Sequence, residues 1–534
     1  MSHLNMRPLA LRTLFQRCRL PRDIVRTACE RYRTRTAMVG SESRRTFAEV
    51  EDRVLRLAEG WRALRLRSRD HVFTLLPDGM ELIEARLAAY ELGAVLTSIH
   101  PRSSAKQVLD AVRLVRPSIL IYDPRIGGSV PEQAAIAMPS LQLIATGRGS
   151  RYETMIATCP PGNSRNRIDP TDPAQICFTA GTSGEPKGVV TSHRAIENGA
   201  RMTAAAMGIT SEDVLLTTVP LVGSGNTILL PSLLSGSTLV ALPSDDTREL
   251  LEAIRRHRVT QLFMTPSQLI DFLDYPGLDR QTLGSVRKIT CGTDRMPASK
   301  LEEAIRRFGP IFQQSYDMAE AFAPLALLEP EEQVRGGEPA SRAVLNSTGS
   351  FVPGVEFRIV NEQDRCVEAN MIGEVMISSP MLFTEYWRRP VLTERVLRNR
   401  WLRTGDLGYL DTEGRVHIVD QRTDLIESSG RLICPRIVEE AAHRHPAVKE
   451  ACLVKGSSAS HSVLFVSLRQ AWTNTDAASV ADREILEFLR SQVQPRQMPG
   501  NVQILKELPR CLLGKVLRRE LRDTLLKDRI AVAS

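Results

Sequence analysis

The chain has 534 residues, of which 42% are hydrophobic and 25% are charged, and its formal net charge is +8. This composition is typical of globular proteins and argues against a disordered or fibrous chain, while the length predicts more than one domain, because single hydrophobic cores stop growing at about 250–300 residues. No apolar run approaches the roughly 18 residues that cross a bilayer and no signal-peptide core is present, so we expect a cytoplasmic protein without a transmembrane segment.

The positive charge comes mainly from arginine, because only nine of the 70 basic residues are lysines. A modest positive excess suits a polyanionic small molecule or a carrier, and no basic stripe interleaved with aromatic residues indicates nucleic-acid binding. The nine cysteines stand singly, without CxxC or Cys/His spacing, which argues against a zinc site and against a disulfide framework. We expect them to be reduced thiols in the core.

Residues 1–24 form a basic segment in which the first acidic residue is Asp23. Such a segment is typical of a membrane-surface helix or an organellar transit peptide, so peripheral membrane contact is an alternative. Serine is scarce in it, which argues against a transit peptide. We therefore interpret residues 1–24 as an ordinary N-terminal arm.

Strand-like runs alternate with helical-period stretches between about residues 40 and 360. This alternation predicts α/β layers with largely parallel sheets. The expected strands begin near residues 71, 118, 214, 238, 260 and 288. Beyond Asp420 shorter elements predict a small α+β domain, with helices near 436–445 and 482–494, strands near 448–454 and 462–469, and a final helix from 515.

Residues 178–188 read FTAGTSGEPKG and follow a strand-like run, AQICF. Glycines allow successive backbone N–H groups to point at one centre, the hydroxyls of Thr179, Thr182 and Ser183 add donors, and Lys187 adds a positive charge. These features predict a cradle for a polyphosphate. The lysine is flanked by proline and glycine, which excludes a Walker A loop, where Ser or Thr follows Gly-Lys.

The loop resembles the (Y/F)TSGTTGxPKGV motif of the adenylate-forming superfamily, which includes acyl-CoA ligases, coumarate-CoA ligases, luciferases and nonribosomal adenylation domains. The resemblance covers about residues 25–525, and further motifs follow in the family's order. Five ordered matches argue against the alternative of a Gly/Thr-rich surface turn. The matches after the loop are YDMAE at 316–320, GEV at 373–375, WLRTGD at 401–406, a hinge-like segment at 420–439 and LPRCLLGK at 508–515.

The resemblance implies that Lys515 bridges the acid and the α-phosphate, that Glu320 positions Mg²⁺ and that Asp406 accepts the ribose hydroxyls. It makes Lys515, Glu320 and Lys187 the expected catalytic residues, with Glu320 as the metal residue. Mg²⁺ needs few protein oxygens when phosphates supply the rest, so a single carboxylate suits this role. The expected ATP- and AMP-binding residues are Thr179, Ala180, Gly181, Thr182, Ser183, Gly184, Lys187, Thr293, Gln314, Ser315, Tyr316, Ala319, Asp406, Gln421, Arg422 and Lys515.

The hinge-like segment departs from the family's pattern. Gln421 stands where the family has arginine, although Arg422 follows it directly, and Thr423 replaces the usual charged hinge residue. The segment also ends in PRIVE, with Ile437, instead of PxEIE. These departures put the ribose contacts and the domain rotation of the family in question, and they suggest a degenerate binding protein as an alternative.

The region expected to hold the acid also departs from the pattern. Asp317 and Ala319 replace the glycine and threonine of YGxTE, and PLVGSG at 220–225 lacks the histidine of PLFHxxG. By resemblance the stretches 224–234 and 291–296 line the acyl site, and they are small and apolar enough for an alkyl or aryl chain. Amino-acid-activating members have an early aspartate that is absent here, which argues against an amino acid. The expected acyl-pocket residues are Gly223, Ser224, Gly225 and Gly292.

The acceptor of the acyl group is expected to be CoA. Members that pass acyl-adenylates to carrier proteins often carry an insertion in the region that matches residues 354–373, and the spacing here is ordinary. Ser429 and Gly430 are the expected CoA contacts. An acyl carrier protein is the alternative partner.

The sequence thus predicts a large multi-subdomain N-terminal α/β domain of adenylate-forming type and a small, mobile α+β C-terminal domain. We expect an adenylation domain at 25–419, a hinge at 420–423 and, at 424–534, the small domain with the catalytic lysine. The predicted function is activation of a fatty or aryl carboxylic acid to acyl-AMP with ATP and Mg²⁺, followed by transfer to CoA. The alternatives are an acyl-AMP ligase that loads an acyl carrier protein and a degenerate nucleotide- or acyl-binding protein, while the context of Lys187 argues against a P-loop phosphotransferase.

Overall fold

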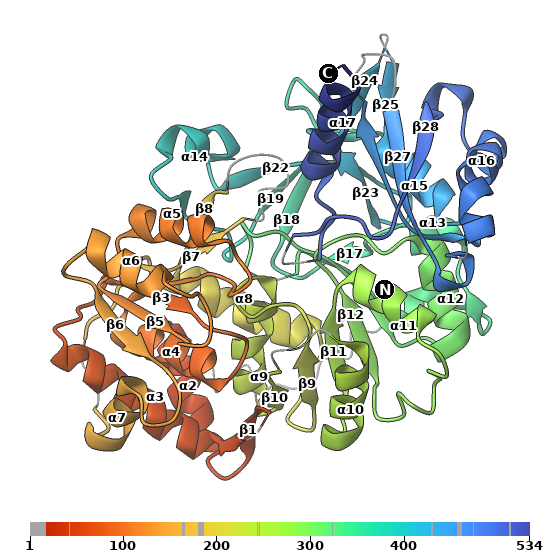
Figure 1. The fold of residues 1–534 in the computed structure, drawn as a ribbon. Coiled ribbons are helices and arrows are strands. Elements are labelled where there is room, and N and C mark those ends of the chain that lie inside the picture. Colours follow the sequence, from red (N-terminus) through yellow and green to blue (C-terminus); the bar gives the residue numbers. More distant parts are fainter. Residues whose placement is uncertain are drawn as a thin grey trace.

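The computed structural model describes residues 18–41, 43–162, 166–179, 186–242, 244, 246–322, 324–428, 431–456, 462–473, 475–511 and 514–533. Residues 1–17 of the predicted arm, residues 180–185 of the predicted phosphate loop and the expected CoA contacts Ser429 and Gly430 lie outside the described residues. The fold class agrees with the prediction: a large N-terminal α/β domain is followed by a smaller C-terminal domain, which lies at the upper right of Figure 1.

One sheet of the large domain has seven strands in the order β20-β8-β7-β4-β3-β5-β6. Its central strands are parallel, and β3 and β4 are almost wholly buried, which suits a sheet covered by helices on both faces. β7 and β8 are antiparallel neighbours, so the predicted phosphate loop connects adjacent strand ends. The strands are β3 (His71–Leu75), β4 (Val95–Ser98), β5 (Ile119–Tyr122), β6 (Gln142–Ala145), β7 (Pro173–Phe178), β8 (Gly188–Ser192) and β20 (Glu385–Tyr386).

A second sheet has nine strands in the order β17-β14-β13-β12-β11-β9-β10-β1-β2. Every pair from β13 to β1 in this order is parallel, and the antiparallel pairs lie at the two ends, so the prediction of largely parallel sheets is confirmed. The strands are β1 (Thr36–Val39), β2 (Arg44–Thr46), β9 (Val214–Thr217), β10 (Thr238–Val240), β11 (Gln261–Met264), β12 (Lys288–Cys291), β13 (Phe312–Tyr316), β14 (Ala326–Leu328) and β17 (Ser350–Phe351).

Helices pack on these sheets, and several begin at caps that their sequences encode. Thr46 and Glu49 form a reciprocal capping box at the start of α3, and Asp246 accepts two N–H groups at the start of α10. The helices are α2 (Pro21–Arg31), α3 (Phe47–Ala63), α4 (Met80–Leu92), α5 (Ala105–Val115), α6 (Val130–Ala137), α7 (Arg151–Thr158), α8 (His193–Ala206), η1 (Ser224–Ile228), α9 (Leu229–Ser235), α10 (Thr247–His257), α11 (Pro266–Asp274), α12 (Ala298–Phe308), η2 (Pro330–Gln333), α13 (Arg342–Leu345) and α14 (Pro390–Val396).

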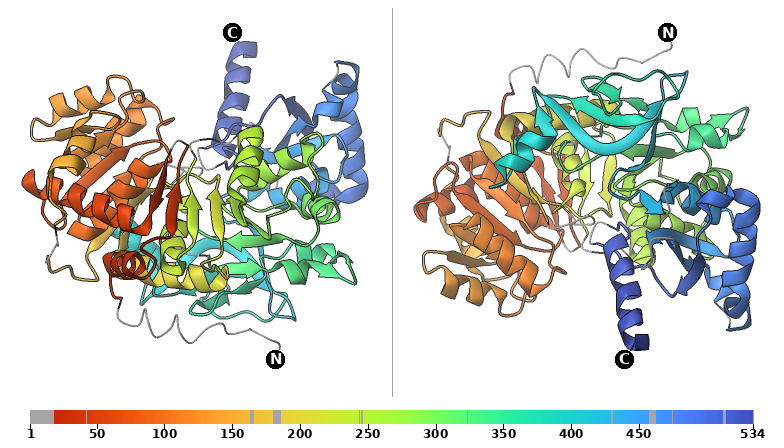
Figure 2. Two further views of the ribbon diagram at one scale, coloured as in Figure 1. Left: turned by 90° about the horizontal axis from the view of Figure 1, so that it is seen from below. Right: turned by 90° about the horizontal axis from the view of Figure 1, so that it is seen from above.

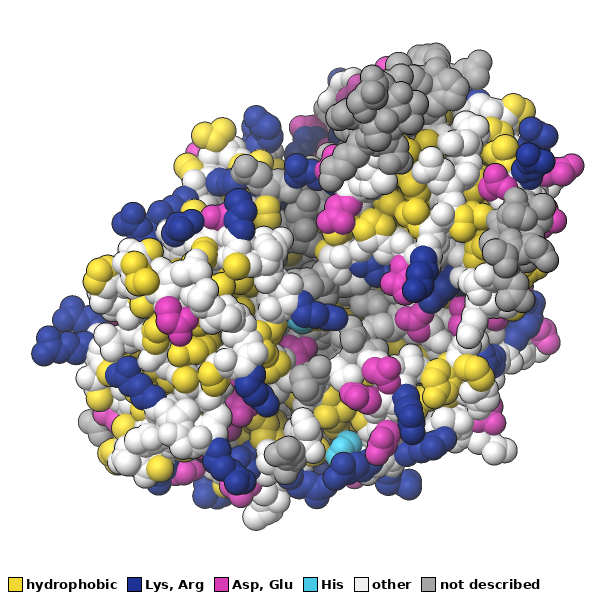
Figure 3. Space-filling model, viewed as in Figure 1, with side chains coloured by type: hydrophobic (Ala, Val, Ile, Leu, Met, Phe, Trp, Pro, Cys, Tyr) yellow, Lys and Arg dark blue, Asp and Glu magenta, His cyan; other side chains and the backbone are white. Residues whose placement is uncertain are grey.

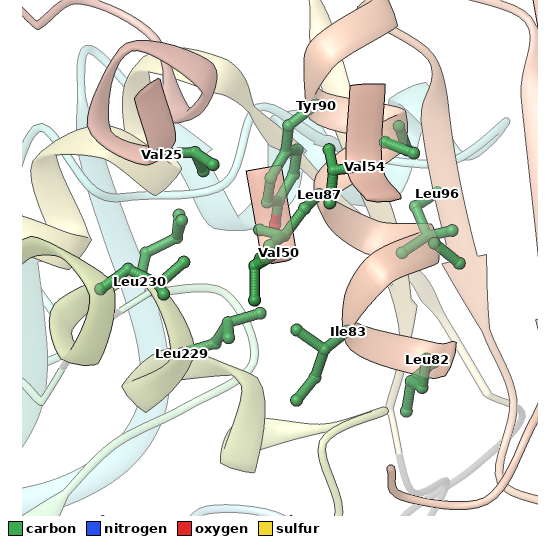
Figure 4. Close-up of a cluster of buried hydrophobic side chains, with 14 of the residues drawn as sticks. Val25, Val50, Val54, Leu82, Ile83, Leu87, Tyr90, Leu96, Leu229 and Leu230 are labelled. Carbon is green, nitrogen blue, oxygen red and sulfur yellow. The ribbon is translucent and has the colours of Figure 1, made fainter. Parts of the chain in front are cut away.

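The largest hydrophobic cluster joins the two sheets of the large domain. Val25 of α2, Val54 of α3, Leu87 of α4 and Leu229 of α9 point into it, as Figure 4 shows, and it reaches strands of both sheets. Each of these side chains is at most 6% exposed. The cluster therefore fixes the two sheets relative to each other by burial of apolar surface.

A third, antiparallel sheet leads to the hinge. It has the order β18-β19-β22-β21, and β23 pairs with the other part of β22 and ends at Gln421. The predicted hinge at 420–423 therefore begins within the last strand of this sheet. The strands are β18 (Glu356–Val360), β19 (Gly373–Ser378), β21 (Leu397–Arg398), β22 (Trp401–Leu410) and β23 (Val416–Gln421), and β15 (Val334–Arg335) and β16 (Glu338–Pro339) form a separate pair.

The C-terminal domain has its own core, in which helices α15 and α16 pack on a three-stranded sheet of order β26-β27-β28. Figure 2 shows it in blue beside the green part of the large domain. Its elements are β24 (Ile426–Ser428), β25 (Arg431–Ile433), α15 (Pro435–Ala442), β26 (Val448–Lys455), β27 (Ser462–Leu468), η3 (Gln470–Trp472), α16 (Thr475–Gln492), η4 (Pro495–Gln497), β28 (Asn501–Leu505) and α17 (Arg518–Ala533).

Three helix boundaries differ from the expectation. The last helix begins at Arg518, not at 515, because a β-bridge between Arg510 and Val516 holds the preceding segment in another conformation. Helix α16 begins at Thr475, before the expected residue 482. Helix α2 begins at Pro21, inside the expected arm, because proline is well tolerated in a first helical turn.

The expectation of core cysteines is wrong for four of the nine residues, since Cys366 is exposed and Cys159, Cys177 and Cys511 are half-buried. Basic and acidic side chains are interspersed on the face shown in Figure 3, without one continuous basic patch. Within the described part of the chain, no helix combines the length and the apolar composition that crossing a membrane requires.

Candidate active site

A cavity of about 900 Å³ lies where the three sheets of the large domain meet the small domain. Both domains line it: β7, β22 and the segment after β13 contribute residues from the large domain, and Arg436 and Lys515 come from the small domain. The predicted residues Lys187, Glu320 and Asp406 line the same cavity. Lys187 and Lys515, which are 328 positions apart in sequence, are thus brought to one site.

The cavity receives the ends of β7 and β8, which flank the predicted phosphate loop. The N–H of Thr179 donates to the carbonyl of Lys187 at 2.9 Å, and the N–H of Lys187 donates to the hydroxyl of Thr179 at 3.1 Å. These two bonds close the base of the loop and hold Lys187 at the cavity wall. Ala180, Gly181, Thr182, Ser183 and Gly184 lie outside the described residues.

Tyr386, which sequence reasoning missed, connects Lys187 with Glu320. The Lys187 Nζ lies 4.9 Å from the centroid of the Tyr386 ring, and the Tyr386 hydroxyl donates to Glu320 Oε1 at 2.6 Å. Burial and the adjacent Glu320 raise the pKa of Tyr386, so it remains a donor. Tyr386 reaches this place because β20 pairs with β8, a long-range pairing that no local pattern in the sequence predicts.

Glu320 fits the single carboxylate expected for Mg²⁺. Its Oε1 accepts the Tyr386 hydroxyl, and no described residue donates to its Oε2, although the residue lines the cavity. Among the described residues, no group of three or more His, Cys, Asp and Glu side chains forms a complete metal site. A cation held here therefore needs oxygens from a ligand or water, which is the usual situation of Mg²⁺ beside phosphates.

The opposite wall of the cavity is formed by β13, β22 and β23. The Tyr316 hydroxyl donates to Asp406 Oδ2 at 2.5 Å, and Gln421 lies directly opposite Asp406 in the β22–β23 register. Burial raises the pKa of Asp406, while the Tyr316 hydroxyl and the charges of Arg436 and Lys515 oppose the shift. The Gln421 side chain also lowers the pKa of this carboxylate through a hydrogen bond.

Arg436, another residue that sequence reasoning did not single out, pairs with Asp420, and its charge also lowers the pKa of Asp406. Its Nε lies 3.8 Å from Asp420 Oδ1, and its N–H donates to Asp420 Oδ2 at 3.2 Å. Arg422 turns toward Glu374 instead, at 3.7 Å, and its side chain is 53% exposed. The arginine whose charge lowers the pKa of Asp406 thus comes from helix α15, and its sequence signal was an unusual arginine in the PRIVE ending of the hinge motif.

The remaining predicted nucleotide-binding residues divide into two groups. Thr293, Ser315 and Ala319 line the cavity. Gln314 is absent from its lining, because its side chain points to the backbone and donates to the Leu345 carbonyl at 3.0 Å. Asp317 also lines the cavity and accepts the Thr293 N–H at 3.0 Å; burial raises its pKa, and the charge of Lys515 opposes this.

Lys515 stands on a short loop that a second arginine attaches to the large domain. Arg510 donates to the Gly514 carbonyl at 2.7 Å and to the Ser267 hydroxyl of α11 at 2.6 Å, and it forms an ion pair with Glu450. Gly514 has a φ of 81°, and a Cβ there would lie 3.1 Å from Thr265. The loop thus depends on glycine both for its conformation and for its close approach to α11.

Further polar contacts dock the small domain in this position. Lys300 of α12 donates to the Val448 carbonyl at 2.9 Å, Lys449 pairs with Asp271 at 2.7 Å, and Arg469 pairs with Glu303 at 2.5 Å. Because these contacts join α11 and α12 to the small domain, they hold Lys515 in the cavity.

The expected acyl pocket is the more apolar side of the cavity. Gly223 lines it, whereas Gly292 is packed behind it, where an added Cβ would meet the Phe263 ring at 3.0 Å. The side chain of Ser224 and the burial of Gly225 are outside the description. Of the expected stretch 224–234, only Thr227 and Ile228 are in the lining, because α9 is buried in the core cluster. Other apolar lining residues are Met207, Phe263, Phe322 and Leu327.

Comparison with known proteins adds family evidence to this geometry. Residues 25–387 match the family model described as AMP-binding enzyme, and residues 437–515 match the model described as AMP-binding enzyme C-terminal domain. Similar curated proteins include the indoleacetate–CoA ligase of Aromatoleum aromaticum, with 27% identity over 92% of this chain and 95% of the relative. The 2-succinylbenzoate–CoA ligase of Bacillus subtilis is 29% identical over 92% of this chain and 95% of the relative.

Solved structures share the fold. The O-succinylbenzoate coenzyme A synthetase from Bacillus subtilis, in complex with ATP and a magnesium ion, has a TM-score of 0.80 and 26% identity, over 94% of this chain and 99% of the other. The anthranilate CoA ligase AuaEII, in complex with anthranoyl-AMP, has a TM-score of 0.86 over 95% of this chain and 97% of the other, with 21% identity. The second likeness concerns the fold alone.

Proposed function

Because the chain belongs to the AMP-binding enzyme family and is an acid–thiol ligase of the acyl-CoA synthetase type, we propose that it activates an aryl or fatty acid and transfers the acyl group to CoA. The observation that carries this proposal is the meeting of Lys515 with Lys187, Glu320 and Asp406 in one cavity. Two cations at one site suit a reaction that joins a carboxylate to a triphosphate, since both reactants are anions.

In the first step a carboxylate oxygen of the acid attacks the α-phosphorus of ATP, and the bond to the pyrophosphate oxygen breaks. Lys515 places its positive charge where the acid and α-phosphate oxygens meet, so it stabilises the charge that develops there. Lys187 binds the departing phosphates, and the Tyr386 ring limits the positions of its ammonium group. Glu320 would hold Mg²⁺, which would neutralise phosphate charge when bound.

The nucleoside is held at the opposite wall. Asp406, oriented by the Tyr316 hydroxyl, accepts the ribose hydroxyls through its second oxygen. Arg436 supplies the positive charge that an arginine at position 421 would otherwise bring near this carboxylate. Because Arg436 supplies this charge, the absence of arginine at position 421 does not argue for a degenerate binding protein, and an active enzyme is favoured.

In the second step the CoA thiolate attacks the acyl carbonyl and AMP leaves. We assign the adenylation domain to 25–419, the hinge to 420–423 and the small domain to 424–534, and we expect the small domain to rotate between the steps. Asp420, which accepts the Arg436 N–H and a bond from Cys434 Sγ at 3.3 Å, is the fully buried anchor from which such a rotation would start.

The test is acid-dependent exchange of labelled pyrophosphate into ATP with Mg²⁺ and without thiol, over a panel of aryl, fatty and amino acids. We expect exchange with aryl or fatty acids, and release of AMP with formation of an acyl-CoA once CoA is added. ATP binding without exchange on any acid would refute the adenylation proposal, whereas exchange with no discharge by CoA would assign the acceptor to a carrier protein.

A further inference from the structure

A buried polar side chain, Gln175, lies on the side of the cavity that we assign to the acyl group. Gln175 of β7 lines the cavity although it is only 7% exposed. The strand rises about 3.3 Å per residue, so Gln175 lies about 13 Å along β7 from Thr179 at the base of the phosphate loop. An acid whose carboxylate is at the phosphates must be long enough to approach Gln175 with its other end.

Two donors fix the orientation of the Gln175 amide. Arg86 Nη1 donates to Gln175 Oε1 at 3.1 Å, and Asn226 Nδ2 donates to the same oxygen at 3.1 Å. A guanidinium has no acceptor atom, so the atom that faces Arg86 must be the oxygen. The NH₂ group of Gln175 therefore points away from Arg86 and Asn226, and no described residue accepts a hydrogen bond from it.

A buried positive charge stands behind this amide. Arg86 of α4 is 3% exposed, and its other bonds go to neutral oxygens, the Leu221 carbonyl at 3.2 Å and the Ser98 hydroxyl at 3.4 Å. Among the described residues Arg86 takes part in no salt bridge; Asp78 accepts the Leu221 N–H at 3.1 Å instead. Charge-assisted donation to Oε1 polarises the amide and makes its free N–H groups stronger donors.

The cavity that contains this donor also has apolar walls. Ile228 of η1, Phe263 of β11 and Phe322 contribute side chains to the cavity, and the Thr290 hydroxyl is already used, because it donates to Gln313 at 2.9 Å. The pocket thus combines apolar walls with a buried donor at its far end. A purely alkyl chain would remove water from that donor without replacing the lost hydrogen bond, which weakens its binding.

We infer that Gln175, backed by Arg86, makes the enzyme select acids that carry a hydrogen-bond acceptor oxygen at the end remote from the reacting carboxylate. This inference rests on the proposed adenylation function and narrows its substrate class to acids with an apolar body and a distal oxygen, such as a hydroxyaryl group or a second carboxylate. Sites built to bond a substrate oxygen discriminate strongly against analogues that lack it.

The experiment compares matched acids with and without the distal oxygen: 4-hydroxycinnamate with cinnamate, and octanedioate with octanoate. Pyrophosphate exchange gives kcat/KM for each acid, and calorimetry gives its Kd in the absence of ATP. We expect the oxygenated member of at least one pair to be preferred by tenfold or more in both measurements.

Gln175→Glu tests the donor with little change of shape. The new carboxylate keeps an oxygen for Arg86 and Asn226, but it presents an acceptor instead of a donor to the cavity. We expect the preference to disappear, with a tenfold or greater loss for the oxygenated acid and an unchanged KM for ATP. The matched control is Gln142→Glu on β6, where the side chain also accepts from an arginine, Arg151, but does not line the cavity.

Equal kcat/KM and equal Kd within both pairs, or a preference that survives Gln175→Glu, would overturn the inference. The proposed function can fail separately. If no acid supports exchange, adenylation is refuted, while the calorimetric preference and its loss in Gln175→Glu still decide whether the cavity recognises a distal oxygen.

Discussion

The Tyr386 hydroxyl donates a hydrogen bond of 2.6 Å to Glu320, and the same ring lies 4.9 Å from the Lys187 ammonium group. One side chain from β20 thus orients both the carboxylate proposed to hold Mg²⁺ and the lysine proposed to bind the phosphates. The relationship depends on the β8–β20 pair, which brings Tyr386 opposite Val189, two residues after Lys187.

Tyr386→Phe should raise the Mg²⁺ concentration needed for half-maximal pyrophosphate exchange by about tenfold, because a hydrogen bond to a charged group contributes about 1.5–3 kcal/mol. The ring over Lys187 is retained, so the fold should be stable. Tyr122→Phe, on a tyrosine outside the cavity, is the control. An unchanged Mg²⁺ dependence would show that Glu320 is oriented without this hydroxyl.

Lys515→Ala should lower the rate of exchange by roughly 100- to 1000-fold, because it removes a preorganised cation from the reacting oxygens. Binding of ATP, measured by calorimetry, should change much less. Lys506→Ala removes an exposed lysine nine positions earlier and should leave both measurements unchanged. Normal exchange by Lys515→Ala would contradict the role assigned to this lysine.

Arg436→Met should raise the KM for ATP by about tenfold, since it removes the positive charge that acts on Asp406 and the side-chain ion pair with Asp420. Arg422→Met should have a smaller effect, because that side chain is 53% exposed and turns toward Glu374. Steady-state kinetics at saturating acid compares the two. A larger effect of Arg422→Met would assign the nucleotide contact to the hinge.

Arg510→Met should slow adenylation but spare thioester formation. Arg510 donates both to Gly514, in the Lys515 loop, and to Ser267 of the large domain, so it holds the loop against the large domain. Pyrophosphate exchange reports the first step, and discharge of purified acyl-AMP by CoA reports the second. Ser267→Ala removes one of these contacts and should show a weaker form of the same effect. Equal slowing of both steps would indicate a general loss of structure.

Asp78→Asn should change how stability depends on pH. Burial raises the pKa of Asp78 to about 6, from an ordinary value of 3.8, while the Leu221 N–H and the charge of Arg86 oppose the shift. The native state therefore holds this proton more tightly than the unfolded chain, and the resulting stabilisation is lost as pH rises from about 4 through 6.

Urea denaturation at pH 4.5 and pH 7 measures the effect. Relative to Asp78→Asn, the wild type should lose about 2 kcal/mol between the two conditions, since the folded-state pKa lies about 1.5 units above pH 4.5 and one pKa unit corresponds to about 1.4 kcal/mol. Asp110→Asn is the control, because a hydrogen bond from Lys106 lowers the pKa of Asp110. The stability of the wild type relative to Asp110→Asn should therefore rise with pH, not fall. A pH-independent difference for Asp78 would refute the assignment.

The sequence by itself determined the fold class, the order of the elements and the catalytic motifs. Strand runs such as those at 71, 118 and 261 could be predicted because apolar periodicity is a local property, and Lys187, Glu320, Asp406 and Lys515 could be found because each lies in a short motif. Helix limits were less predictable: Arg518 rather than 515 begins α17, because the β-bridge between Arg510 and Val516 competes with the helix.

Only the tertiary structure decided which side chains support those motifs. Tyr386 reaches Glu320 through a strand pair that spans almost 200 residues, and the charge of Arg436 acts on Asp406 across the domain junction. Arg86 and Gln175 meet only because α4 packs on β7's sheet. The neighbours of these side chains are set by packing between distant segments, and no spacing in the sequence indicates which segments pack together. Hydrogen bonds and charges act over a few ångströms in space, whatever the separation of the residues along the chain.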